Sequence, residues 1–107
     1  MIENVMIDAV NYRVTQTDET IIVGGAVCGG EVDYNAAHIR LGNVLGESAK
    51  IKVLMHEIFH AMLYERGISD EFQDEDLINA LASGTVNLIR QNPALIKFLR
   101  GDKIDAD

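Results

Sequence analysis

The chain of 107 residues has one cysteine, one proline and no tryptophan. Its single cysteine, Cys28, excludes an internal disulfide and a metal site built from several cysteines, which is typical of a reducing compartment. Basic residues are scarce as well, because 9 lysines and arginines stand against 17 aspartates and glutamates, for a formal net charge of −8. This charge disfavours contact with a phosphate backbone, so we expect no direct nucleic-acid partner.

Long apolar runs are also missing. None approaches the length that spans a bilayer, and the N-terminal segment MIENVMIDAV has acidic residues where a signal peptide has basic ones. We therefore expect a cytoplasmic protein with no membrane partner. Linkers, internal repeats and low-complexity tracts are missing too, which predicts a single domain over residues 1–107 that ends in an acidic tail, 102–107.

The first half of the chain predicts a small sheet. Residues 1–46 contain most of the glycines, and β-branched or aromatic residues alternate there with polar ones. This pattern predicts three strands in an antiparallel sheet. Strand signals lie near residues 10–14 and 21–23, and a hairpin is expected over residues 31–43, where the chain returns through His38–Leu41.

The second half, residues 47–101, predicts three helices, so the fold class is α+β. The first helix covers residues 50–66, where apolar residues recur at helical spacing, and it ends at Gly67. The second begins near Asp74. The third and shortest begins at Asn92-Pro93, a pair typical of a helix N-terminus.

The first of these helices contains the pattern H-E-x-x-H, as His56-Glu57-Ile58-Phe59-His60. Residues four apart lie on the same face of a helix one turn apart, so both imidazoles can bind one zinc ion. Glu57 lies beside that face, where a carboxylate can take a proton from a water acidified by the metal. The spacing therefore predicts a zinc site with Glu57 as general base.

A different interpretation makes His56 and His60 core residues, each hydrogen-bonded to backbone or carboxylate groups, with no metal. Two of only three histidines stand at ligand spacing with Glu57 between them, which favours the metal site. Apolar surroundings favour it further, because neutral, desolvated imidazoles are good zinc ligands.

A catalytic zinc usually has three protein ligands and one open position. No histidine follows His60, so the third ligand is expected to be a carboxylate from the acidic segment SDEFQDED. Glu75 is the preferred candidate because it falls in the first turn of the second helix, and Asp76 is the alternative. Asn79 shares a helix face with Glu75 and is expected to hydrogen-bond a ligating imidazole without contacting the metal itself.

The segments HEIFHAMLYERG and EDLINALASG resemble the zinc-dependent gluzincin peptidases. They are most similar to the small ImmA/IrrE-like and SprT-like metallopeptidases associated with phages and mobile elements. Other parts of the chain match the pattern of this group more loosely: Tyr12-Arg13-Val14, Gly30-Glu31-Val32-Asp33-Tyr34 and His38–Leu41. The resemblance covers most of the chain, although only H-E-x-x-H is a specific motif.

The resemblance implies a minimal zincin-like fold with one zinc per chain. His56, His60 and Glu75 would be its ligands and Glu57 the general base. Asn79 stands where related enzymes often have an acid that orients the first histidine. A peptide substrate would pair with an edge strand formed by His38, Ile39, Arg40 and Leu41.

Larger members of the group stabilise the oxyanion with an additional His or Tyr. Tyr64, His38 and Tyr34 are the candidates here. The chain also lacks a lower subdomain that would complete a cleft, so a partner or a second copy in a homodimer could supply the missing wall.

Three functions follow from these observations. The first is a zinc metallo-endopeptidase of narrow specificity, whose substrate would be a peptide or a regulatory protein such as a phage or mobile-element repressor. The second is a metal-binding interaction module that keeps the peptidase fold without turnover. Intact Glu57 disfavours it, because a structural zinc needs ligands but no base. The third is a structural domain without metal.

Overall fold

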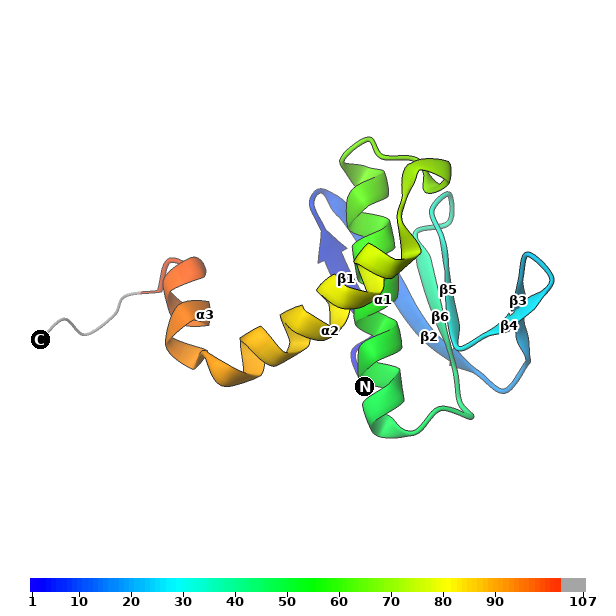
Figure 1. The fold of residues 1–107 in the computed structure, drawn as a ribbon, viewed down its shortest axis with the longest axis horizontal. Coiled ribbons are helices and arrows are strands. Elements are labelled where there is room, and N and C mark those ends of the chain that lie inside the picture. Colours follow the sequence, from blue (N-terminus) through cyan, green and yellow to red (C-terminus); the bar gives the residue numbers. More distant parts are fainter. Residues whose placement is uncertain (103–107) are drawn as a thin grey trace, which may run out of the picture.

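The computed structural model of the chain describes residues 1–102, so most of the expected acidic tail, residues 103–107, lies outside the described part. The protein is α+β, with all strands before all helices (Figure 1). The strands are β1 (Asn4–Ile7), β2 (Val10–Thr17), β3 (Ile21–Val23), β4 (Ala26–Cys28), β5 (Gly30–Asp33) and β6 (His38–Gly42). The helices are α1 (Glu47–Glu65), the 3₁₀ turn η1 (Asp70–Phe72), α2 (Glu75–Gln91) and α3 (Pro93–Leu99).

The main sheet has four strands in the order β1-β2-β6-β5. β1 pairs antiparallel with β2, β2 pairs parallel with β6, and β6 pairs antiparallel with β5. The expected three-stranded antiparallel sheet is therefore wrong in strand number and in direction. The chain leaves β2, reaches the far edge as β5 and returns as β6 into the space between them, so β6 runs parallel to β2.

Residues 21–28 do not join the main sheet. β3 and β4 pair only with each other, across a turn in which Gly24 and Gly25 have φ angles of 58° and 83°. Such positive φ angles at both central residues are typical of a tight hairpin turn and suit glycine best. The segment therefore forms a separate two-stranded hairpin, while β1, whose sequence gave little strand signal, provides the fourth strand of the main sheet.

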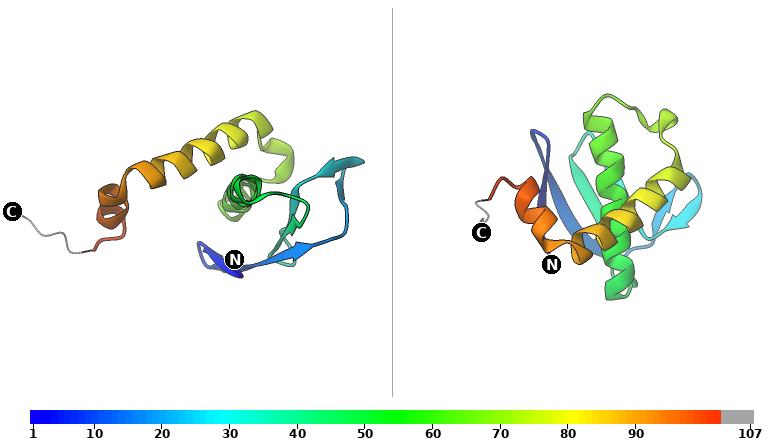
Figure 2. Two further views of the ribbon diagram at one scale, coloured as in Figure 1. Left: turned by 90° about the horizontal axis from the view of Figure 1, so that it is seen from below. Right: turned by 60° about the vertical axis from the view of Figure 1, so that its left-hand side comes forward.

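The core lies between the sheet and α1, which crosses one face of the sheet (Figures 1 and 2). Tyr12, Val14, Ile39 and Leu41 alternate along β2 and β6 and are buried there, together with Ala61 of α1. This is the period-two pattern of a sheet with one buried face.

Helix α1 begins at Glu47, three residues before the expected start at residue 50, and the other helix boundaries lie close to those expected. Gly67, with φ 92°, follows the last turn of α1, and Asp74 caps α2 by accepting a hydrogen bond from the Leu77 amide at 3.1 Å. Pro93 occupies the first turn of α3. Within residues 1–102, no helix combines the length and the apolar character needed to cross a membrane.

Candidate metal centre

Helix α1 presents His56 and His60 toward the same point. Their Nε2 atoms are 3.0 Å apart and their rings meet edge to face, with centroids 4.7 Å apart. One helical turn separates the two residues, which places their side chains on one face. Both histidines are largely shielded from solvent, since α2 crosses over α1 at this level (Figure 1).

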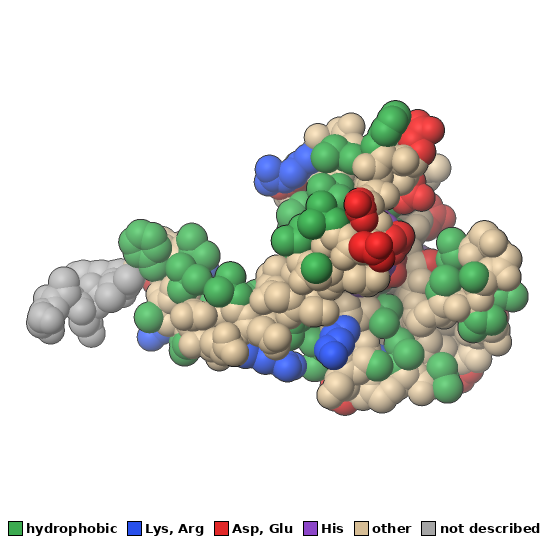
Figure 3. All heavy atoms as spheres, viewed as in Figure 1, with side chains coloured by type: hydrophobic (Ala, Val, Ile, Leu, Met, Phe, Trp, Pro, Cys, Tyr) green, Lys and Arg blue, Asp and Glu red, His purple; other side chains and the backbone are tan. Residues whose placement is uncertain are grey.

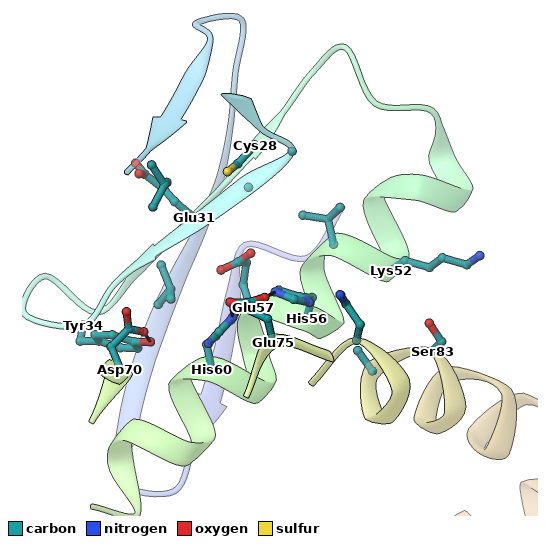
Figure 4. A pocket seen from close by; sticks show the side chains of 17 residues that line it. Cys28, Glu31, Tyr34, Lys52, His56, Glu57, His60, Asp70, Glu75 and Ser83 are labelled. Carbon is teal, nitrogen blue, oxygen red and sulfur yellow. Dashed lines mark hydrogen bonds and ion pairs between the residues drawn. The ribbon is translucent and has the colours of Figure 1, made fainter. Parts of the chain in front are cut away.

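Glu75, the first residue of α2, brings a carboxylate to the two imidazoles. Its Oε2 is 3.0 Å from Nε2 of His56, and its Oε1 is 2.8 Å from Nε2 of His60. Figure 4 shows the three side chains converging from α1 and α2. The Asp74 cap fixes where α2 begins, and it thereby fixes the position of Glu75.

These three side chains could hold a metal ion. One donor atom from each lies within 4.8 Å of the others, and the individual separations are near 3 Å. Donors in a tetrahedral zinc site, with bonds of about 2.0–2.1 Å, are roughly 3.3 Å apart. The donor separations therefore fit a small divalent cation closely. The third candidate ligand is Glu75, and Asp76 is not part of the cluster.

Gln73 orients the imidazole of His60. Its Nε2 donates to the backbone carbonyls of Ile68, at 3.0 Å, and His60, at 3.3 Å. Carbonyl oxygens only accept, so Oε1 of Gln73 must face Nδ1 of His60, with which it is in contact. His60 then carries its proton on Nδ1, and the lone pair of Nε2 faces the other two candidate ligands.

The expected hydrogen bond between Asn79 and a ligating imidazole is not found among the described residues. Asn79 lines the same cavity as His56 and His60, but Gln73 makes the contact with His60. Gln73 was not predicted, because it lies in the irregular connection between α1 and α2, where no periodicity indicates the direction of a side chain.

Glu57 lies beside the cluster and is buried, with 7% of its surface exposed. Burial raises the pKa of its carboxyl to about 7; the neighbouring His60 opposes this shift and the negative charge of Glu75 adds to it. Figure 4 shows the Glu57 side chain next to His56 and Glu75. A carboxylate in such surroundings is well suited to exchange protons near neutral pH.

The cluster opens into a cavity of about 600 Å³ between α1, α2 and β5. Gly30, Glu31 and Val32 of β5 form one wall, and Asn79, Ala82 and Ser83 of α2 form another. Gly30 allows α1 to approach β5, because a Cβ at this position would lie 2.6 Å from Cγ1 of Val53 and 3.0 Å from the Arg40 carbonyl.

Of the three residues expected to stabilise an oxyanion, only Tyr34 lines this cavity. Its ring stacks on Tyr64 with centroids 4.2 Å apart, and its hydroxyl donates to Oδ1 of Asp70 at 2.7 Å. Burial and this contact raise the pKa of Tyr34, so the phenol stays protonated. His38 instead contacts Thr15 and Arg13 on β2.

The expectation that His38–Leu41 forms an edge strand is wrong. β6 is hydrogen-bonded to β2 on one side and to β5 on the other, and Ile39 and Leu41 are fully buried. The backbone of β6 therefore has no free side for a peptide. The edge of the sheet next to the candidate ligands is β5.

The chain matches no protein-family model, no curated protein and no solved structure. The resemblance to gluzincin peptidases accordingly stays a prediction from the motif.

Proposed function

We propose that the protein is a zinc metallopeptidase that hydrolyses a peptide bond in the cavity between α1, α2 and β5. The observation that supports this proposal is the placement of buried Glu57 next to the convergent donors of His56, His60 and Glu75. Metal ligands alone would suit a structural site as well. A buried carboxylate beside them adds the proton acceptor that hydrolysis requires.

His56, His60 and Glu75 would hold one zinc ion per chain, which supplies Lewis-acid polarisation of the peptide carbonyl and acidifies water. Glu57 takes a proton from the attacking water and passes it to the nitrogen of the departing amine. Gln73 would keep the Nε2 lone pair of His60 directed toward the point shared with His56 and Glu75. Tyr34 lines the same cavity and is our candidate for oxyanion stabilisation, for which its single O–H must turn from Asp70 to the oxyanion.

The substrate would lie extended along β5, by addition of a strand to the free edge of the sheet. Gly30, Glu31 and Val32 of this edge line the cavity, which leads directly to the zinc ligands. This assignment replaces the substrate strand His38–Leu41 expected from the sequence. From the resemblance, we propose a protein substrate such as a repressor-type regulator, cleaved in the cytoplasm.

The test is hydrolysis of a mixed peptide library by the zinc-loaded protein, with products identified by mass spectrometry. Glu57→Gln is expected to abolish cleavage while it retains zinc, because the amide cannot accept the proton but Glu57 is not a ligand. Glu71→Gln, an equal change at an exposed position outside the cavity, is the matched control and should cleave like wild type. Wild type that binds one zinc and cleaves no peptide, or equal cleavage by Glu57→Gln, would overturn the proposal.

A further inference from the structure

The second half of α2 and all of α3 extend away from the rest of the protein (Figures 1 and 2). Val86 is the last buried residue of α2, and no side chain of residues 87–100, the helical arm, is buried. The radius of gyration is 15.1 Å, against about 13 Å for a compact domain of this length. A short helical extension of this kind gains little stability from propensity alone, so it needs a surface to pack against.

An apolar stripe runs along the exposed side of α2. Leu77, Leu81 and Leu88 are 57%, 44% and 49% exposed, and at 100° per residue they fall within about 40° of one another. With Gly84 they are spaced by four, three and four residues, which is the a/d spacing of a two-helix seam. The face of α2 that packs on α1 is a different one, formed by Ile78, Ala82 and Val86.

Acidic and basic side chains lie in different parts of the chain. Residues 1–76 contain fourteen acidic and five basic side chains, whereas residues 77–100 contain three basic side chains, Arg90, Lys97 and Arg100, and no acidic one. Acidic side chains gather where α2 begins, and hydrophobic ones cover the end of the arm (Figure 3). The arm is therefore apolar and basic, and the rest of the protein is acidic.

We propose that the stripe is covered by a second copy of this chain, in a two-fold symmetric dimer formed by antiparallel pairing of the two α2 helices. The antiparallel arrangement brings the basic arm of each protomer to the acidic start of α2 in its partner. It also places Leu81 of one helix near Gly84 of the other, where the lack of a side chain lets the helices approach closely.

An anionic membrane is the other surface that suits an apolar and basic helix. Charge complementarity favours a second copy of the chain over such a membrane. The acidic body of the protein would be repelled by such a membrane, but it attracts the arm of a second copy. The stripe lies on the side of α2 opposite Glu75 and Asn79, so the dimer does not use the candidate metal ligands, and this proposal is independent of the proposed function.

Analytical ultracentrifugation over a wide concentration range tests the dimer. We expect a mass of twice 11.8 kDa for wild type. Leu81→Glu and Leu88→Glu should each raise the dissociation constant of the dimer at least about a hundredfold. Each substitution would bury an unpaired carboxylate between the two α2 helices. Val44→Glu is the matched control, because Val44 is 94% exposed and lies outside α2, and it should dimerise like wild type.

Retained helical circular dichroism and cooperative unfolding in urea would show that the two leucine variants are folded. A wild-type monomer at all concentrations would overturn the proposal, and so would a dimer that both leucine variants leave intact. Monomeric protein that binds anionic phospholipid vesicles through the arm would also overturn it, in favour of a membrane-docking arm.

Discussion

Each ring nitrogen of His60 has a different partner. Nδ1 contacts Gln73, and Nε2 lies 2.8 Å from the carboxylate of Glu75. Because the Gln73 amide is itself fixed by two backbone carbonyls, it can hold the imidazole in only one tautomer. Loss of a hydrogen bond that orients a metal-binding imidazole commonly lowers metal affinity by about 10–100-fold.

We therefore predict that Gln73→Ala weakens zinc binding by about 10–100-fold, measured by competition with a chelator of known affinity. Gln91→Ala, which removes an exposed amide at the end of α2, should leave the affinity unchanged. Equal affinities for wild type and Gln73→Ala would show that Gln73 does not position His60.

At the level of single residues, the sequence identified the parts of the site that depend on helix geometry. The spacing of His56 and His60 predicts that their rings meet, and the start of α2 indicates Glu75 over Asp76; the structure brings these three residues together. Gln73 could not be predicted. It follows η1 in an extended conformation, and its direction depends on how the α1–α2 connection folds.

The elements around the site depend on two local features, the cap of α2 and the glycine of β5. Asp74 determines where α2 begins, and Glu75 follows it directly. We predict that Asp74→Ala lowers the free energy of unfolding by about 1 kcal/mol, from loss of the cap, and also weakens zinc binding. Urea unfolding and chelator competition measure the two effects. A loss of stability without any loss of zinc affinity would mean that Glu75 is positioned independently of the cap.

Gly30 controls the distance between β5 and α1. A methyl group there would meet Val53 and the Arg40 carbonyl, so Gly30→Ala is expected to destabilise the protein by about 1–3 kcal/mol in urea unfolding. Gly46→Ala is the control, because a Cβ at Gly46 has open space around it and only the poorer N-cap preference of alanine acts there, so the loss should be smaller. Similar losses in both variants would argue against close packing at Gly30.

The order of the strands could not be predicted from local pattern. Alternation along His38–Leu41 correctly indicated a strand with one buried face, but alternation does not show which neighbours a strand has. The parallel pairing of β2 with β6 joins residues 25 apart in the chain, and it depends on the hairpin β3–β4 leaving the sheet. The edge beside the candidate metal ligands is therefore β5.

At the scale of the whole molecule, the sequence predicted the α+β class, with strands before residue 46 and helices after it, and the structure confirms this class. It did not predict that α2 extends beyond the part that packs on α1. The amphipathic pattern of α2 places apolar residues on two faces, and only one of them is covered in a single chain.

The central claim is that His56, His60 and Glu75 form one zinc site, and metal content is its most direct test. Zinc should be quantified by mass spectrometry in protein purified without an affinity tag, for wild type and for the variants His60→Ala, Glu75→Ala and Asp76→Ala. We predict about one zinc per chain in wild type and in Asp76→Ala, and strongly reduced zinc in the other two variants. Wild type that contains no zinc and takes up none when zinc is added would contradict the account.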